Sequence, residues 1–65
     1  MSSIQALSNK LAVLGYTGYE IAELIRSVTH GRKLQTLSAA KLRRVTDVLE
    51  QHVRLGTEFV ATYSK

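Results

Sequence analysis

The chain has 65 residues, a net charge of +4, 45% hydrophobic residues and no cysteine. A chain this short forms one domain at most, and without cysteine it forms neither a disulfide scaffold nor a cysteine-bound zinc site. Its hydrophobic content is that of a globular protein and excludes an intrinsically disordered chain. The first residues lack a secretory signal, and polar residues interrupt every apolar segment. We therefore expect a single domain over residues 1–65 that is cytoplasmic and not bound to a membrane.

The basic residues are distributed unevenly along the chain. The stretch from Arg26 to Arg44 holds six basic residues and no acidic one, whereas the rest of the chain sums to −2. Such an asymmetry attracts polyanions or acidic partners over a range set by the Debye length, roughly 8 to 10 Å in physiological salt. The expected partner is therefore nucleic acid or an acidic protein surface.

The first predicted helix covers about residues 3–14, with Ser2 or Ser3 as its N-cap and Gly15 as its stop. Apolar residues recur there at the 3,4,3 spacing of one helix face, namely Ile4, Leu7, Leu11 and Leu14.

The second predicted helix covers residues 18–30. Thr17-Gly18-Tyr19-Glu20 has the form of a capping box, in which the threonine hydroxyl and the glutamate carboxylate each accept a bond from the other residue's backbone amide. Gly31 supplies a left-handed C-cap. The apolar side of this helix is formed by Ile21, Leu24, Ile25 and Val28.

The third predicted helix follows a connector in which Leu34 and Leu37 are expected to reach the core. Ser38 or Thr36 caps the helix, and its apolar face is formed by Leu42, Val45, Leu49 and Val53. Opposite charges four residues apart predict ion pairs on its outer side. These pairs are Arg43 with Asp47 and Glu50 with Arg54.

The end of the third helix has two interpretations, which depend on Gly56. In the first, the helix covers residues 39–55 and a short fourth helix covers 57–63. In the second, one helix extends from Ala39 to Tyr63, and an interior glycine costs roughly 1 kcal/mol. The continuous helix would carry a second apolar stripe, which implies a dimer. This stripe consists of Val48, Leu55, Phe59 and Tyr63. Both interpretations predict an all-α fold, a small three-helix bundle with or without a short fourth helix.

The basic stretch is the candidate binding site. Its functional interpretation is a phosphate-contacting surface, and the alternative is an ordinary solvated face. Asp47 is expected to neutralise Arg43, and Glu23 lies one turn from Arg26. Cations near a helix N-terminus oppose the helix dipole, which favours the functional interpretation. The predicted nucleic-acid-binding residues are Arg32, Lys33, Lys41 and Arg44, with Arg26 in support.

No arrangement typical of an active site occurs in the sequence. His30 and His52 are the only histidines, and a metal site would need several of the five carboxylates to gather around them. We interpret His30 as a helix-terminal residue and His52 as a residue at the border of an apolar face. No glycine-rich phosphate loop or nucleophile elbow is present. The chain is therefore predicted not to be an enzyme and to hold no metal ion or cofactor.

Several short motifs resemble, in their mutual spacing, those of a known family. They cover most of residues 7–55 and read Leu14-Gly15, Leu24-Ile25, Val28-Thr29 with a nearby glycine, and Leu37-Ser38-x-x-x-Leu42-x-x-Val45. Together they resemble the helical core of the GemA regulatory proteins of Mu-like phages. The resemblance implies a non-enzymatic phage or prophage regulator that acts on host gene expression, and it implies no catalytic residues.

Two functions are thus expected from the sequence. The first is a small regulatory module that contacts nucleic acid, DNA included, or a nucleic-acid-processing complex, through the basic residues. The second is a protein-binding or homodimerisation module that uses the apolar stripe near the C-terminus. The two are compatible, because a dimer doubles the basic surface.

Overall fold

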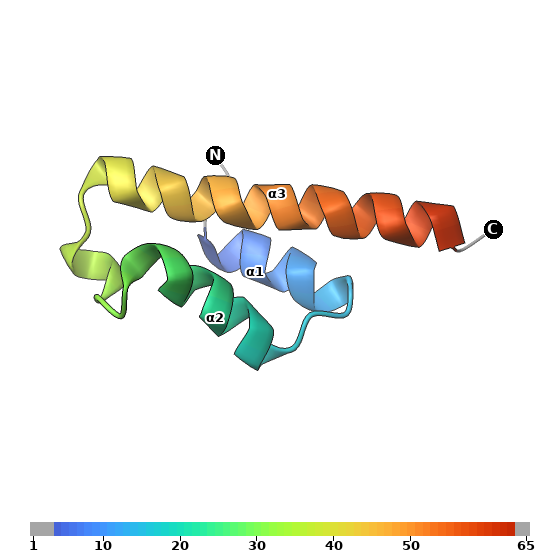
Figure 1. Ribbon diagram of the computed structural model, residues 1–65, viewed down its shortest axis with the longest axis horizontal. Coiled ribbons are helices and arrows are strands. Elements are labelled where there is room, and N and C mark those ends of the chain that lie inside the picture. The colour runs from blue at the N-terminus through green and yellow to red at the C-terminus, as the bar shows by residue number, and fades with distance from the viewer. Residues whose placement is uncertain (1–3, 64–65) are drawn as a thin grey trace.

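The computed structural model describes residues 4–63, which form three α-helices and one 3-10 turn. The helices are α1 (Ile4–Val13), α2 (Gly18–Thr29) and α3 (Ala39–Tyr63), and the turn is η1 (Leu34–Thr36). Figure 1 shows α1 running beside α3 in the same direction, with α2 returning in the opposite one. The predicted all-α class and three-helix bundle are confirmed.

The first helix ends through a Schellman motif at Gly15. This glycine has a left-handed φ of +108°, and its amide donates to the carbonyl of Ala12 at 3.1 Å. The amide of Tyr16 donates to the carbonyl of Leu11 at 3.0 Å. These two bonds satisfy carbonyls that the helix leaves without partners, and glycine adopts the required φ without a Cβ clash. The predicted stop at Gly15 is confirmed, whereas the predicted caps Ser2 and Ser3 lie outside the described residues.

The second helix begins with the predicted capping box. Thr17 Oγ1 accepts the amide of Glu20 at 3.1 Å, and Glu20 Oε1 accepts the amide of Thr17 at 2.9 Å. The Thr17 backbone, followed by its hydroxyl, lowers the pKa of Glu20 below the ordinary value of 4.5, because both bonds favour the ionised carboxylate.

The C-cap of α2 falls one residue earlier than predicted. His30 is left-handed, with φ 56° and ψ 34°, and Gly31 follows with φ +85°. The amide of His30 still donates to the carbonyl of Arg26 at 2.8 Å, so the last helical hydrogen bond of α2 is made by His30, one residue before Gly31. Histidine tolerates the left-handed region better than most residues. Two successive left-handed residues then turn the chain towards α3.

The third helix is continuous through Gly56, so the predicted fourth helix over 57–63 does not exist as a separate element. An interior glycine costs only roughly 1 kcal/mol, which a helix of this length tolerates, and Gly56 lies against the residue that follows α1. A Cβ at Gly56 would lie 3.1 Å from Leu14 Cδ1 and 3.6 Å from Leu14 Cβ. Glycine therefore allows close contact between α3 and Leu14, and its role is not to end the helix. The 25 residues of α3 span about 37 Å, most of the 43 Å length of the molecule.

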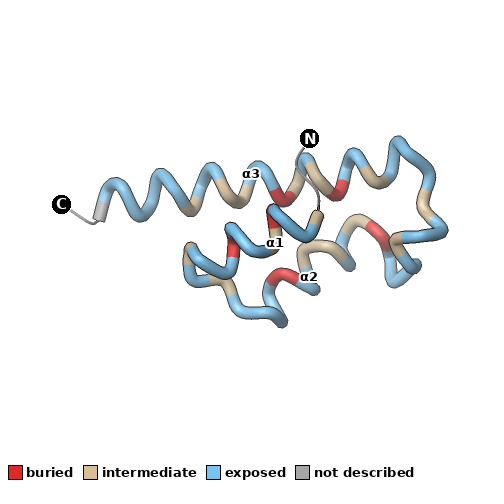
Figure 2. Tube along the Cα trace, turned by 180° about the vertical axis from the view of Figure 1, so that it is seen from behind, coloured by how far each residue is buried: buried red, intermediate tan, exposed pale blue. Residues whose placement is uncertain are grey.

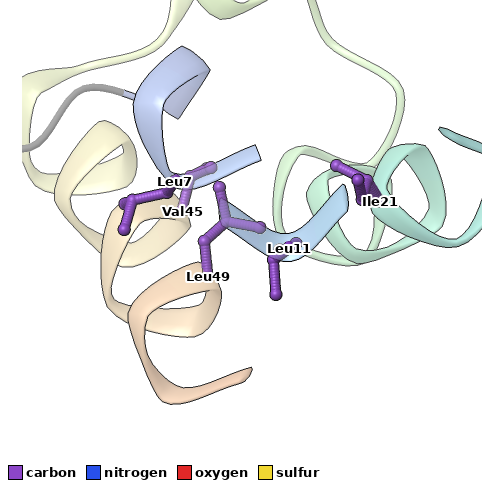
Figure 3. Close-up of a cluster of buried hydrophobic side chains, with 5 residues drawn as sticks. All are labelled: Leu7, Leu11, Ile21, Val45 and Leu49. Carbon is purple, nitrogen blue, oxygen red and sulfur yellow. The ribbon is translucent and has the colours of Figure 1, made fainter. Parts of the chain in front are cut away.

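The core lies where the three helices face one another. Leu7 and Leu11 of α1 meet Val45 and Leu49 of α3, and Ile21 approaches from α2 (Figure 3). Half-buried side chains surround this cluster, among them Ile4, Tyr16, Leu24, Ile25, Val28, Leu37 and Val53. Leu37 thus reaches the core as predicted, whereas Leu34 is half-buried outside the cluster.

The last turns of α3 extend past the end of α1 and are mostly exposed (Figure 2). In a molecule of this size, such a projecting segment gains little from the core and leaves its apolar side chains exposed to solvent.

Candidate nucleic-acid interface

The five predicted binding residues are all exposed, and four of them lie where the chain turns from α2 into α3. Arg32 and Lys33 belong to the connector, and Lys41 and Arg44 to the first turns of α3. We call these four residues the basic corner. Arg26 lies apart from it, on the outer side of α2.

A hollow of about 630 Å³ opens at the basic corner. Val28 and Leu37 contribute apolar walls, and Arg32 and Lys41 contribute cations from the two sides of the connector. His30 and Ser38 also line it, together with Thr29 and Thr36. No carboxylate belongs to this lining, so the charge at the hollow is positive at neutral pH.

Local hydrogen bonds fix the connector that forms one side of the hollow. The amide of Arg32 donates to the carbonyl of Thr29 at 3.2 Å, and the amide of Gly31 donates to Thr29 Oγ1 at 3.3 Å. Thr29 is 5% exposed, so these bonds attach the connector to a buried residue. Arg32 is thereby held near the end of α2.

The other side of the hollow is built by the start of α3. Ser38 Oγ accepts the amide of Lys41 at 3.3 Å, which is an N-cap bond and confirms Ser38 as the predicted cap. A hydroxyl that accepts in this way still has its own hydrogen to donate. Thr36 differs, because its hydroxyl donates to the carbonyl of Lys33 at 2.7 Å. Thr29 Oγ1 also accepts an amide, but Thr29 is buried, so Ser38 is the exposed hydroxyl in the hollow that can donate to an anion.

Two other basic residues, Arg43 and Arg26, do not belong to the basic corner. Arg44 lies three residues after Lys41, on a neighbouring side of α3, whereas Arg43 lies about 200° around the helix from Lys41. Arg26 Nη1 lies 3.7 Å from Glu23 Oε1. Both side chains are largely exposed, so this pair contributes little to stability, but it partly neutralises Arg26.

The predicted ion pairs on α3 do not form. Among the described residues, the ion pair of Arg26 with Glu23 has no counterpart between Arg43 and Asp47 or between Glu50 and Arg54. All four of these α3 side chains are exposed. Exposed pairs of this kind gain too little Coulomb energy to offset the ordering of two long side chains. Arg43 and Asp47 therefore make no ion pair, contrary to the prediction.

Four polar lining residues were not predicted as part of the site, namely Thr29, His30, Thr36 and Ser38. The sequence indicated Ser38 and Thr36 as caps and His30 as a helix end. Their common position at the end of α2 or in the connector that carries Arg32 and leads to Lys41 was the available signal. Without knowledge of the turn at His30, that signal did not show which side chains share a hollow.

The predicted apolar stripe is only partly exposed. Val48 is half-buried, whereas Leu55 is 53% and Phe59 61% exposed. The side chain of Tyr63 lies outside the described residues. Val60, 41% exposed, lies on the same projecting turns, and Val13, 87% exposed, lies at the end of α1 beside Val53 and Thr57. Tyr19, 76% exposed, lies apart from them at the start of α2. We call Val13, Leu55, Phe59 and Val60 the apolar end.

A second hollow, of about 330 Å³, lies between α1 and α3 near the apolar end. Its lining is mostly apolar, with Lys10 as its charged member, and consists of Asn9, Lys10, Val13, Leu14, Val53 and Thr57. We call it the α1–α3 groove.

His52 is a half-buried residue with a bonded ring, as predicted. Its Nδ1 lies 2.9 Å from the carbonyl of Val48, and its ring meets that of Tyr16 edge to face at a centroid distance of 6.2 Å. A carbonyl only accepts, so Nδ1 carries the hydrogen. Within residues 4–63, no group of three or more metal-ligating side chains comes together. None of the helices in this range is both long and apolar enough to cross a membrane.

Comparison with known proteins gives no relative from which to transfer a function: no family model, no curated protein and no solved structure matches the chain. The resemblance to the GemA proteins therefore stays a prediction, and the function has to be argued from the site.

Proposed function

We propose that the chain is a small non-enzymatic module that binds the phosphate backbone of nucleic acid through the basic corner. The observation that carries this proposal is the hollow at the corner, where Arg32 and Lys41 share a lining that contains no carboxylate. The connector and the first turn of α3 hold these two cations at fixed backbone positions. A regulatory role in gene expression, which the resemblance to the GemA proteins implies, is part of the proposal.

The chemistry of the corner suits phosphate better than a neutral ligand. Arginine offers a planar fork of donors and lysine a compact charge, and both are typical phosphate contacts. The hydroxyl of Ser38 adds a neutral donor beside them. Contacts of this type read the backbone and not the bases, so binding is largely independent of sequence and weakens as salt increases.

Binding of a labelled DNA duplex, titrated against salt and followed by fluorescence anisotropy, tests the proposal. The double variant Arg32→Gln, Lys41→Gln should lower the affinity and reduce the slope of log K against log salt by about 2, because each lost phosphate contact reduces it by about 1. Arg54→Gln is the matched control, because it removes an exposed arginine from the outer side of α3, away from the corner. It should leave the slope nearly unchanged.

Two results would contradict the proposal. Absence of duplex binding at low salt removes it outright. An equal loss of affinity in the Arg54→Gln control and in the corner variant shows that net charge, and not the corner, attracts the polyanion. Polyglutamate serves as competitor: displacement of DNA at equal charge concentration would indicate an acidic protein surface as the partner instead.

Self-association is a second proposed function, favoured by one specific observation. Four of the five large apolar side chains that are exposed among the described residues belong to the apolar end, and three of these lie on the last turns of α3, at the opposite end of that helix from Lys41 and Arg44. Scattered apolar residues are normal on a protein surface, but a concentrated group marks an interaction site.

A further inference from the structure

The apolar end carries a groove and a projecting helix side by side. Val53, Thr57 and Val60 follow one another at spacings of four and three residues, so they lie on one side of α3. Val53 and Thr57 line the α1–α3 groove, and Val60 continues their line onto the projecting turns. The groove and the exposed Val60 therefore belong to one surface.

That surface can be buried without leaving a polar group unpaired at its centre. The hydroxyl of Thr57 donates to the carbonyl of Val53 at 2.8 Å, so its methyl group is left for contact across an interface. Asn9 and Lys10 lie at the edge of the groove, where polar side chains stay hydrated.

We propose that the occupant of this surface is a second copy of the chain, with two α3 helices packed antiparallel about a two-fold axis near Thr57. Val60 lies seven residues, about 10 Å, beyond Val53 along the helix. In the antiparallel pair, Val60 of each copy enters the groove of the other, beside Val53 and Val13. A two-fold interface requires complementary features on one surface, and the groove with its adjoining Val60 meets this requirement.

Charge favours a second copy at this surface. α1 carries one charged residue, Lys10, and residues 55–63 carry one, Glu58, of opposite sign. With Arg54, which follows Val53, each apolar end carries +1 and contains both signs, whereas each basic corner carries +4. The basic corner lies at the other end of α3, so this dimer keeps the two positive corners apart, whereas a contact near the corners would bring like charges together.

This inference rests on the second proposed function, and sedimentation velocity on the full chain separates the two. The expected result is a dimer that forms with increasing concentration. Val60→Asp should abolish it. The matched control Thr62→Asp places the same charge about 200° around the same helical end and should keep it. Circular dichroism establishes that both variants remain helical.

The contrary outcomes have different consequences. A wild-type chain that stays monomeric up to about 1 mM overturns both self-association and the inference. A dimer that persists in Val60→Asp overturns the inference alone, because association then uses another surface. Loss of the dimer in Thr62→Asp as well also overturns it, since the effect is then not specific to the groove side.

Cysteine cross-linking gives a second, independent measurement, because the chain has no cysteine of its own. A two-fold axis near Thr57 brings the two copies of that residue together, so Thr57→Cys should form a disulfide-linked dimer about tenfold or more faster than a cysteine at the exposed Gln35. Equal rates at the two positions would overturn the proposed axis.

Discussion

Replacing Gly56 by alanine tests the account of α3 as one continuous helix. Glycine in a helix interior costs roughly 1 kcal/mol relative to alanine, part of which comes from the greater freedom of the unfolded chain. Against this gain stands the new Cβ, which would lie 3.1 Å from Leu14 Cδ1 and 3.7 Å from Leu14 Cγ. The tight contact is with the terminal methyl of a half-buried side chain that borders a groove. A shift of a few tenths of an ångström relieves it.

The expected net effect of Gly56→Ala is therefore a stabilisation of about 0.5 kcal/mol, since the displacement of one flexible methyl costs less than the 1 to 3 kcal/mol typical of overpacking a closed core. A domain of this size gains about 4 to 8 °C per kcal/mol, so the melting temperature should increase by about 2 to 4 °C. Thermal and urea unfolding, followed by the helical circular dichroism signal, measure both quantities.

A second background isolates the contact with Leu14. In a Leu14→Ala chain, the obstructing methyl is absent, and Gly56→Ala should give the full gain of roughly 1 kcal/mol. A different result would refute the reasoning: destabilisation by about 1 kcal/mol or more in both backgrounds. That result is expected of a glycine with positive φ that ends a helix, and it would restore the interpretation with a break at Gly56.

Three further predictions concern stability. Leu11→Ala should cost about 2 to 5 kcal/mol, because Leu11 is 0% exposed and the total stability of a 65-residue domain is only about 3 to 10 kcal/mol; urea unfolding should show a chain that is partly unfolded without denaturant. Thr17→Ala should cost about 1 kcal/mol through loss of the capping box, and Thr17→Asn, which keeps an N-cap acceptor, should recover most of it. The lowered pKa of Glu20 stabilises the fold above pH 4.5, and this contribution should be lost as pH falls through the pKa of the folded state. Glu20→Gln should remove this part of the pH dependence of the melting temperature.

The helices and their caps could be predicted because their causes are local. The capping box needs only Thr17 and Glu20 at a spacing of three, and the stop at Gly15 needs only a residue that tolerates a left-handed φ. The apolar spacing of Leu7, Leu11 and their neighbours likewise depends on helical periodicity alone. Such features are encoded within one or two turns of chain, and the structure agrees with them.

Other features depend on contacts between distant segments, which spacing does not reveal. The close contact of Gly56 with Leu14, 42 positions earlier, is one such feature, because a Cβ at Gly56 would lie 3.1 Å from Leu14 Cδ1. The grouping of Arg32 with Lys41 likewise depends on the turn at His30, which begins one residue before the glycine that the sequence indicated. The missing pair of Arg43 with Asp47 is a different case, because the spacing was correct but the energy of an exposed pair is too small to hold it.

Together the two proposals predict the shortest DNA duplex that can contact both basic corners of a dimer. Lys41 lies 16 residues before Thr57, about 24 Å along α3, so an antiparallel dimer with its axis at Thr57 places the two copies of Lys41 roughly 48 Å apart. At about 3.4 Å per base pair, a duplex needs about 14 base pairs to reach both corners. Binding to the second corner is then intramolecular, so affinity should increase sharply between duplexes of about 10 and 18 base pairs. Val60→Asp should remove this increase while leaving the affinity for the short duplex unchanged, because it separates the copies and does not alter Arg32 or Lys41. A length dependence that is equally steep in Val60→Asp would show that each basic corner acts alone.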